Sequence, residues 1–278
     1  MISAANSCSQ PARWQFLNTG FRPGAFNMHM DESLARALSR GDGSPTLRVY
    51  GWAPHALSLG FHQQMSDIDE RRCAEYGIDI VRRPTGGRAI LHADELTYSA
   101  VMEGRGKNIS TVYAEISEAL VTGLRSLGAD VDFARAQPDL GRLYQSPTSI
   151  PCFSSSSRFE IQSRGKKLVG SAQRRYASAA GNDVVLQHGS ILLGPGHQLL
   201  SELVDAKDLE FRRSLRTMLE TKTTDLTSVL GATVSFDEVA AAIRKGFEEA
   251  WNIEMTDVEY EAFEVAGEME LAHDNHSS

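Results

Sequence analysis

Cys152 has the clearest capacity for covalent chemistry in this sequence, and it lies in the segment SIPCFSSSSRFEI. Most cysteines are small, inert core side chains. Here a proline precedes the thiol and a run of serines follows it, which indicates an accessible polar loop. Positive charge nearby lowers a thiol pKa and raises the nucleophilic thiolate fraction, so the basic stretch that follows favours a reactive cysteine. The other two cysteines, Cys8 and Cys73, lack such surroundings.

The segment VRRPTGGRAILHADELTYS is suited to binding a carboxylate, a phosphate or a carbonyl group. Its Gly86-Gly87 pair permits backbone angles that other residues avoid and lets a ligand approach the main chain closely. Arg82, Arg83 and Arg88 supply guanidinium donors around that pair. The P-loop pattern GxxxxGK[ST] and the dinucleotide pattern GxGxxG are both absent from this segment. Taken alone, Thr-Gly-Gly also fits a simple tight turn, so both interpretations stay open.

The segment GKKLVGSAQ is a strand candidate that carries Lys167, with Gly170 marking a bulge or a close approach. An inward lysine could offer its ammonium to a substrate carbonyl, whereas a lone lysine on a strand is usually a solvated edge residue. Between positions 158 and 175 six basic side chains stand against one acid, Glu160. This basic strip predicts either a solvated strand edge or a contact surface for an acidic carrier protein.

The composition narrows the class of protein. A chain of 278 residues that is 41% hydrophobic and 23% charged is typical of a globular protein with one large domain. No apolar run approaches the ~20 residues that cross a bilayer, and the N-terminus lacks the features of a secretory signal. We therefore expect a cytoplasmic protein without a membrane partner. The formal net charge of -8 argues against nucleic acid as a partner.

Cysteine and histidine spacing argues against disulfides and metals. Three widely spaced cysteines fit a reducing compartment and do not form a disulfide framework or a CxxC site. The histidines show no HxxxH or HExxH spacing, so we expect no metal site.

Hydrophobic periodicity predicts the elements that position these segments. Helices are expected over 25–39, 67–76, 110–127 and 236–251, with Ser66 or Asp67 capping the second and Ser235 or Asp237 the last. Strands are expected over 46–52, 56–61, 77–83, 89–92, 95–101, 130–133, 158–162, 166–173 and 184–193, with a hairpin turn at Ser163-Arg164-Gly165. This order indicates the α+β class: a mixed β-sheet flanked by helices, with a small helical C-terminal appendage. We expect a flexible N-terminus over 1–13, one domain over 14–260 whose part 194–260 is helical, and a disordered tail over 261–278.

Four segments occur in the order RRPTGGRAILHADELTYS, SIPCF, GKKLVGSAQRR and LQHGSILL. Together they resemble the biotin/lipoate protein ligase superfamily, and in particular its cysteine-dependent octanoyltransferases of the LipM type. The resemblance extends from about Trp14 to about Trp251. It implies the catalytic-domain fold shared with biotin protein ligase, and an acyltransferase that moves an octanoyl group from octanoyl-acyl carrier protein to a lipoyl-domain lysine. The acceptor would be the glycine-cleavage H protein or a dehydrogenase E2 domain, and a monomer is the default expectation.

The resemblance also implies roles for individual residues. A family cysteine at the position of Cys152 attacks the thioester and holds the acyl group covalently, and a lysine at the position of Lys167 contacts the acyl carbonyl. The substrate-binding residues expected from the motifs are Arg83, Thr85, Gly86, Gly87, Arg88, His92, Gly170, Ser171 and Ala172. Exchange between two thioesters is nearly isoenergetic, so no nucleotide or other cofactor is required. The octanoyl tail needs a narrow apolar slot, for which Leu96, Tyr98 and Val169 are the expected lining.

Three departures separate the chain from ATP-dependent lipoate ligases. Those enzymes typically have a third glycine where this sequence has Arg88, and they lack a cysteine at the position of Cys152. They also commonly carry an extra C-terminal domain. The alternatives left open are an ATP-dependent lipoate-protein ligase, an amidotransferase that moves octanoyl or lipoyl groups between lipoyl-domain proteins, and a non-catalytic acyl-binding relative.

Overall fold

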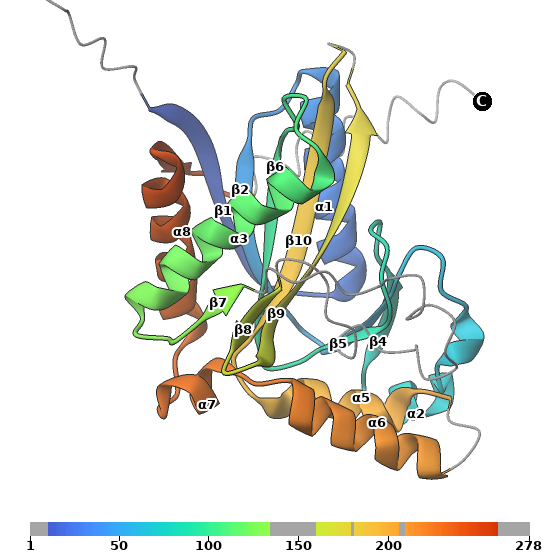
Figure 1. Ribbon diagram of the computed structural model, residues 1–278. Helices are drawn as coiled ribbons and strands as arrows, with labels where there is room; N and C mark the ends of the chain where they lie inside the picture. Colours follow the sequence, from blue (N-terminus) through green and yellow to red (C-terminus); the bar gives the residue numbers. More distant parts are fainter. Residues whose placement is uncertain (1–10, 134–159, 179–180, 206–208, 261–278) are drawn as a thin grey trace, which may run out of the picture.

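A computed structural model describes residues 11–133, 160–178, 181–205 and 209–260. Within these residues an eight-stranded sheet has the order β11-β1-β2-β6-β10-β9-β8-β7, and a three-stranded sheet has the order β4-β3-β5 (Figure 1). The large sheet consists of β1 (Ala12–Arg22), β2 (Thr46–Trp52), β6 (Glu95–Glu103), β7 (Asp132–Phe133), β8 (Ile161–Ser163), β9 (Lys166–Ala177), β10 (Asp183–Leu192) and β11 (Ile253–Asp257). The small sheet consists of β3 (Ala56–Leu59), β4 (Asp79–Arg82) and β5 (Ile90–His92).

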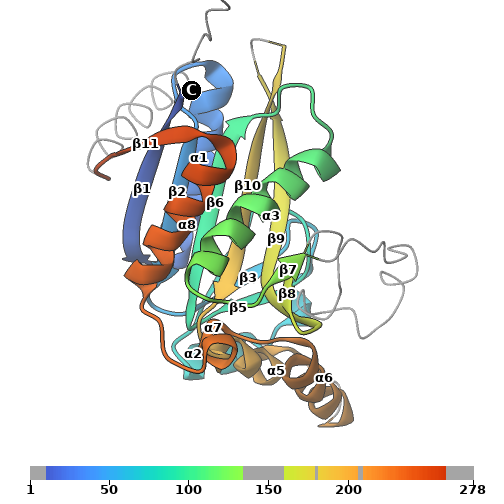
Figure 2. The same cartoon turned by 60° about the vertical axis from the view of Figure 1, so that its left-hand side comes forward.

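Helices cover both faces of the large sheet. The α-helices are α1 (Gly24–Arg40), α2 (Glu70–Glu75), α3 (Ile109–Ser126), α5 (Leu200–Leu203), α6 (Leu209–Lys222), α7 (Leu226–Leu230) and α8 (Phe236–Trp251). Two 3-10 turns, η1 (Met65–Asp67) and η3 (Pro195–Leu199), complete the described helical segments. Helices α3 and α8 cross one face of the sheet, and α1 lies on the other (Figures 1 and 2). The mixed sheet flanked by helices confirms the predicted fold class.

Strand β6 shows how the two faces of the large sheet differ. Successive side chains of a strand point to opposite faces. Leu96 and Tyr98 belong to the main core that includes residues of α3 and α8, whereas Val101 belongs to the smaller core with α1. Thr97 therefore lies on the α1 side, where it is 3% exposed. A buried polar side chain on this face must find hydrogen-bond partners, and it does so in the site described below.

Short-range signals account for the helix ends. Ser235 caps α8 in a capping box with Glu238, as the sequence predicts. The cap of α2 is Asp69, which accepts a hydrogen bond from the backbone N–H of Arg72, so the predicted caps Ser66 and Asp67 are wrong. Both residues instead belong to η1, a separate 3-10 turn that precedes the helix. The hairpin turn between β8 and β9 is confirmed.

The two ends of the described chain meet at an edge of the sheet. Strand β1 pairs in parallel with β11 on one side and with β2 on the other. Neither β1 nor β11 is among the strands predicted from the sequence. Strand β1 also begins at Ala12, two residues before the expected start of the domain at position 14. The expected flexible N-terminus and disordered tail otherwise fall outside the described residues.

The C-terminal part is more than an appendage. It is helical as predicted, but it also supplies β11 to the sheet. Helix α8 lies directly against α3, because a Cβ atom added at Gly246 would come within 2.4 Å of the Ala119 carbonyl oxygen. Phe247 and Ile243 of α8 enter the same core as the sheet. Among the described helices, none has the length and apolarity needed to cross a membrane.

Candidate active site

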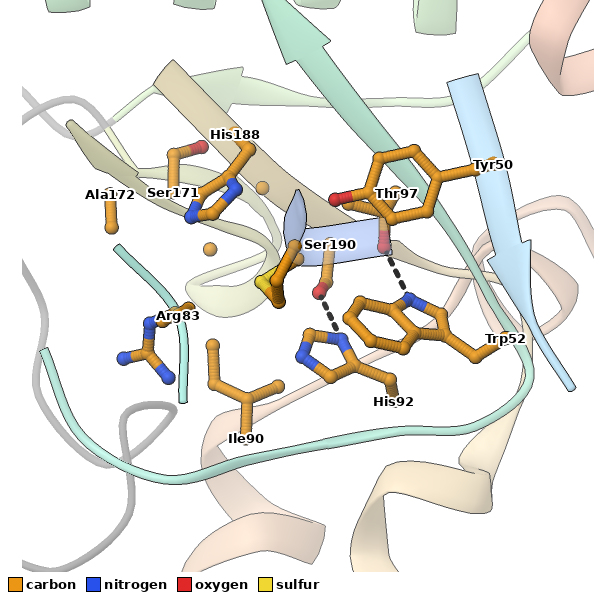
Figure 3. Close-up of a pocket in the computed structure, with 13 residues that line it drawn as sticks. Tyr50, Trp52, Arg83, Ile90, His92, Thr97, Ser171, Ala172, His188 and Ser190 are labelled. Carbon is orange, nitrogen blue, oxygen red and sulfur yellow. Dashed lines mark hydrogen bonds between the residues drawn. The ribbon is translucent and has the colours of Figure 1, made fainter. Parts of the chain in front are cut away.

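A pocket lies over the α1-side face of the large sheet, where that face meets the small sheet (Figure 3). The free space between its walls, counted out to its open mouth, is ≈ 340 Å³. We call this the first pocket; its lining residues are Met28, Tyr50, Trp52, Arg83, Ile90, His92, Thr97, Gly170, Ser171, Ala172, His188, Gly189 and Ser190. Five of the residues predicted to bind substrate are in this set, namely Arg83, His92, Gly170, Ser171 and Ala172.

The pocket runs across the strands. Its lining comes from β2, β6, β10 and β9, which are neighbours in that order. With about 4.8 Å between adjacent strands, the three steps span about 14 Å. At the β9 end Ser171 and Ala172 are partly exposed, whereas Trp52 at the β2 end is only 4% exposed. The first pocket therefore opens beside β9 and is closed at β2.

His92 is held at the closed end by polar partners on both ring nitrogens. Its Nδ1 lies 2.8 Å from Glu95 Oε1, and its Nε2 lies 2.7 Å from Ser58 Oγ. Thr97 donates a hydrogen bond to the same Glu95 oxygen at 2.6 Å, and so does Ser190 at 2.8 Å. The imidazole is thus fixed in place on both ring nitrogens, and the Thr97 and Ser190 hydroxyls hold the carboxylate that binds it.

A buried ion pair supports the wall formed by α1 and β2. Arg48 donates to Asp31 Oδ1 at 2.7 Å, and both side chains are completely buried. Burial would raise the pKa of Asp31, but the Arg48 guanidinium and the hydrogen bond from His188 outweigh it and hold that pKa below its usual value. Tyr50 donates to Asp31 at 2.8 Å, and burial together with the Asp31 charge raises the pKa of Tyr50 well above its usual value. Since Arg48 compensates the Asp31 charge, an apolar ligand can lie against this wall.

The TGGR loop is joined to this network through Thr85. Its hydroxyl lies 2.7 Å from His188 Nε2, and His188 Nδ1 lies 2.9 Å from Asp31 Oδ2. Hydrogen bonds therefore connect Thr85 of the loop, through His188 of β10, to Asp31 of α1. Thr85 itself is 1% exposed, so its role in the described structure is to anchor the loop.

The Arg83 guanidinium donates hydrogen bonds to the TGGR loop and to Ser58 of β3. It donates to the carbonyl oxygens of Gly86 at 3.0 Å and Arg88 at 2.6 Å, and to Ser58 Oγ at 3.0 Å. Its side chain lines the first pocket, and these hydrogen bonds also hold the TGGR loop in place. Gly86, Gly87 and Arg88 do not line that pocket; Gly86 and Gly87 form the exposed tip of the loop.

Glycine is required at position 189, where β10 pairs with Ser171 of β9. A Cβ atom at Gly189 would lie 2.5 Å from Ser171 Oγ and 2.6 Å from the Gly170 carbonyl oxygen. Such distances are too short for any other residue without a shift of the wall. The same Cβ atom would lie 2.8 Å from Tyr98 Cε1, so it would point toward the main core. The GSA and HG segments, paired on β9 and β10, form the β9–β10 surface of the first pocket.

Lys167 lies on β9, the strand at the mouth of the first pocket, but it does not line that pocket. Its ammonium donates to Glu160 Oε1 at 2.6 Å, and the two side chains are 7% and 8% exposed. The basic strip is accordingly not a continuous charged surface, since Arg175 also forms an ion pair with Asp183 and Arg174 stacks on Phe61. The reading of this strip as a solvated strand edge is wrong for Lys167, which is buried.

Cys152 lies outside the described residues, so its predicted role stays a prediction. Cys73, by contrast, is a buried core residue of α2 that is 1% exposed. Burial, reinforced by Asp69 and Glu70, raises the pKa of Cys73 to about 11. This thiol is therefore almost entirely protonated at neutral pH, in agreement with the inert role expected for it.

The residues expected to line the apolar slot do not face the first pocket. Leu96, Tyr98 and Val169 belong to the main core and do not line the first pocket. The lining residues that were not predicted from the sequence are Met28, Tyr50, Trp52, Ile90, Thr97, His188, Gly189 and Ser190. The available signal was the alternation of β6, which places Thr97 opposite its two apolar neighbours.

Comparisons with known proteins agree with the fold. Residues 23–248 match the family described as the lipoyl protein ligase A/B catalytic domain. Octanoyltransferase LipM of Kyrpidia tusciae is 42% identical over 242 residues, which cover 85% of this chain and 86% of that protein. Octanoyltransferase LipM of Geobacillus kaustophilus is 36% identical over 271 residues, with 95% and 96% covered.

Solved structures share the architecture. A bipartite lipoate protein ligase of Thermoplasma acidophilum, studied with its E2 lipoyl domain, aligns with a TM-score of 0.70 at 24% identity, covering 90% of this chain and 87% of that one. A lipoate-protein ligase A bound with ATP aligns with a TM-score of 0.68 at 25% identity, covering 90% and 89%. The TGGR loop and the β9–β10 surface thus lie on the fold of lipoate-handling enzymes.

Proposed function

The chain belongs to the lipoyl protein ligase A/B catalytic domain family and, within it, to the octanoyltransferases of the LipM type, and from this premise we propose the route of its octanoyl group. It is an acyltransferase of lipoate biosynthesis. The octanoyl group comes from octanoyl-acyl carrier protein, is held as a thioester on Cys152, and passes to a lysine of a lipoyl-domain protein. The enzyme works as a monomer in the cytoplasm.

The observation that best supports this proposal is the shape of the first pocket. It is narrow, it runs across three strand intervals, and its closed end is formed by Tyr50, Trp52 and Thr97. A slot that is open at one end suits an unbranched acyl chain whose carbonyl remains at the mouth. The mouth lies on β9, the strand that carries Lys167 at its beginning.

The chemistry needs two acyl transfers. The Cys152 thiolate adds to the carbonyl carbon of the octanoyl thioester, a new C–S bond forms, and the carrier leaves as its thiol after taking a proton. The ε-amine of the acceptor lysine then attacks the Cys152 thioester. The C–N bond forms, the Cys152 thiolate leaves, and the amine proton passes to solvent. Both tetrahedral intermediates carry an oxyanion, which Lys167 and backbone N–H groups near Gly86-Gly87 would stabilise.

The acceptor is proposed by likeness to a relative. One of the structural neighbours is a lipoate ligase studied together with its E2 lipoyl domain. We infer that this chain acts on the same class of domain, in the form of the glycine-cleavage H protein or a dehydrogenase E2 component.

Intact-mass spectrometry tests the first transfer. The purified protein is incubated with octanoyl-acyl carrier protein in the absence of ATP, and we expect one octanoyl adduct on the wild type and none on Cys152→Ala. Cys73→Ala is the matched control and should keep the adduct, because the Cys73 thiol is buried with a pKa raised to about 11. An adduct on Cys152→Ala, or none on the wild type, would overturn the proposed route.

The same assay separates the alternatives. A strict requirement for ATP and free lipoate would establish a ligase, an activity that fold neighbours such as lipoate-protein ligase A make worth testing. Transfer from octanoylated H protein to an E2 lipoyl domain, faster than transfer from the acyl carrier protein, would establish an amidotransferase. Purified H protein and E2 lipoyl domains, offered separately, then identify the acceptor.

A further inference from the structure

A patch of positive charge around one exposed aromatic ring lies beside the mouth of the first pocket. Its centre is Phe61, in the loop that follows β3, which is 47% exposed. The Arg174 guanidinium lies 5.2 Å from the centre of the Phe61 ring. Arg82 Nη1 donates to the carbonyl oxygens of Phe61 at 3.2 Å and of Gln63 at 2.8 Å. We call Phe61, Arg82 and Arg174 the mouth patch.

The mouth patch adjoins the first pocket without lining it. Alternation along β9 places Ala172 and Arg174 on the same, α1-side face, about 7 Å apart along the strand. Ala172 lines the first pocket, whereas no member of the mouth patch does. Arg174 Nη1 donates to the Pro84 carbonyl oxygen at 3.1 Å, and the Phe61 backbone N–H donates to the Thr85 carbonyl oxygen at 3.0 Å. The patch is therefore fixed to the TGGR loop and to β9.

The charge of the mouth patch is opposite to that of the chain as a whole. The formal net charge is -8, so an acidic partner is repelled unless the local charge is reversed where it docks. Arg175 is neutralised by an ion pair with Asp183. Among the described residues, by contrast, neither Arg82 nor Arg174 has a carboxylate partner, and Arg82 is exposed. Two uncompensated positive charges therefore remain beside the mouth.

We propose that the mouth patch is the docking surface for the acidic acyl carrier that donates the octanoyl group. The inference rests on the proposed function, because it takes the first pocket as the octanoyl site with the carbonyl at β9. Aromatic and arginine side chains are enriched at protein interfaces, and here they combine an apolar contact with positive charge for an acidic surface.

The place of the patch favours the donor over the acceptor. An acyl carrier holds its thioester on a long prosthetic arm, so its body can rest on Phe61 and the two arginines while the acyl group enters the mouth. The acceptor offers only a lysine side chain and must come over the mouth itself. A surface beside the first pocket, outside its lining, therefore suits the carrier.

Two octanoyl donors test the patch, one with a carrier and one without. Octanoyl-acyl carrier protein and the small thioester octanoyl-N-acetylcysteamine are offered to the wild type, Arg82→Glu and Arg174→Glu, and acylation is read by intact mass. We expect KM for the carrier to rise about 10-fold or more in each variant, because like charges then face each other, while kcat/KM for the small thioester stays within about 2-fold. Arg82→Gln and Arg174→Gln keep an N–H donor for the loop and should give a smaller rise.

The matched control reverses one charge elsewhere. Lys245 is an exposed residue of α8, which lies on the sheet face opposite α1 (Figures 1 and 2), so Lys245→Glu should keep the wild-type KM. Salt gives a second readout. Higher ionic strength should raise the wild-type KM for the carrier and should have less effect in the Arg82→Glu/Arg174→Glu double variant.

Three results would overturn the docking surface while the proposed function stands. The first is an unchanged KM for the carrier in both charge reversals. The second is an equal loss with both donors, which would make the arginines supports of the loop. The third is unchanged acylation with slower transfer from the acyl-enzyme to a lipoyl domain, which would assign the patch to the acceptor. If the wild type takes no octanoyl group from the carrier, the proposed function fails and the docking surface fails with it.

Discussion

Lys167 and Glu160 face each other across the β8–β9 hairpin, with Lys167 Nζ 2.6 Å from Glu160 Oε1 and both side chains almost completely buried. The lysine that the resemblance assigns to the acyl carbonyl is thus already held by a carboxylate. Removing one partner of a buried pair leaves an uncompensated charge and typically costs about 3–5 kcal/mol. The same pairing keeps the ammonium pointed in one direction, so Glu160 is a positioning residue for Lys167.

The first prediction separates the structural role of Lys167 from its chemical one. Lys167→Met and Glu160→Leu should each lower the free energy of unfolding by about 3–5 kcal/mol. The double variant should lose less than the sum, because neither buried charge then remains. Urea denaturation measures all four proteins. Acyl transfer should nonetheless stay lost in the double variant. Wild-type transfer by that variant would contradict any catalytic role for Lys167.

The second prediction concerns His197, which lies next to the beginning of β9. It is 2% exposed and its Nε2 lies 2.7 Å from Thr223 Oγ1, while Thr223 forms a backbone bridge with Lys167. Burial lowers the pKa of His197 below its usual value. The unfolded chain therefore takes up this proton at about pH 6.5, whereas the folded protein takes it up only at a lower pH.

Stability should accordingly be lost on the acid side. As the pH falls from about 7 through 6.5, the unfolded state binds the proton first, and the free energy of unfolding decreases until the lowered pKa of the folded state is reached. His197→Gln should lack this part of the decrease, and the exposed His62→Gln should retain it. Urea titrations at pH 7.5, 6.5 and 5.5 give the slopes. Equal slopes for His197→Gln and the wild type would contradict the prediction.

Elements with a local pattern could be predicted from the sequence. Helix α8 is observed at its predicted bounds because its apolar period and its capping box lie within the helix itself. Strands β1 and β11 could not be predicted in this way, because their pairing joins segments about 240 residues apart. Neither strand has a strict alternation of apolar and polar residues of its own. Arg83, His92 and the Gly170–Ala172 segment were predicted from motifs, and they meet in the first pocket. The four motifs in their order predict the fold even though each motif alone is ambiguous.

The partners of those residues were harder to find. Asp31 on α1, Tyr50 on β2 and His188 on β10 meet only in the folded sheet, so no sequence spacing indicates their contact. The Lys167–Glu160 pair is different. The sequence predicts a hairpin turn at Ser163-Arg164-Gly165, and this turn brings Glu160, the one acid of the basic strip, near Lys167. The register pairs Lys167 with Gln162, so the turn predicts that Glu160 lies near Lys167 but not the ion pair itself.

The third prediction uses the close approach of β3 to the TGGR loop. A Cβ atom at Gly60 would lie 1.9 Å from the carbonyl oxygen of Gly87, so Gly60→Ala must displace the backbone of the loop. Gly86 is the matched control, because a Cβ atom there meets nothing within 4 Å and its φ is not positive. The loop braced by Arg83 offers little room for adjustment, since its carbonyl oxygens are already bound.

We expect Gly60→Ala to lower the free energy of unfolding by about 1–3 kcal/mol, as overpacking of a tight contact does. Gly86→Ala should change it by less than about 0.5 kcal/mol, or raise it slightly because the unfolded chain loses entropy. Acyl transfer should fall at least about 10-fold in Gly60→Ala, because small displacements of positioning groups are costly in rate. Urea denaturation and the intact-mass assay measure both effects. Unimpaired stability and transfer in Gly60→Ala would show that the loop can move away from β3 without consequence for the site.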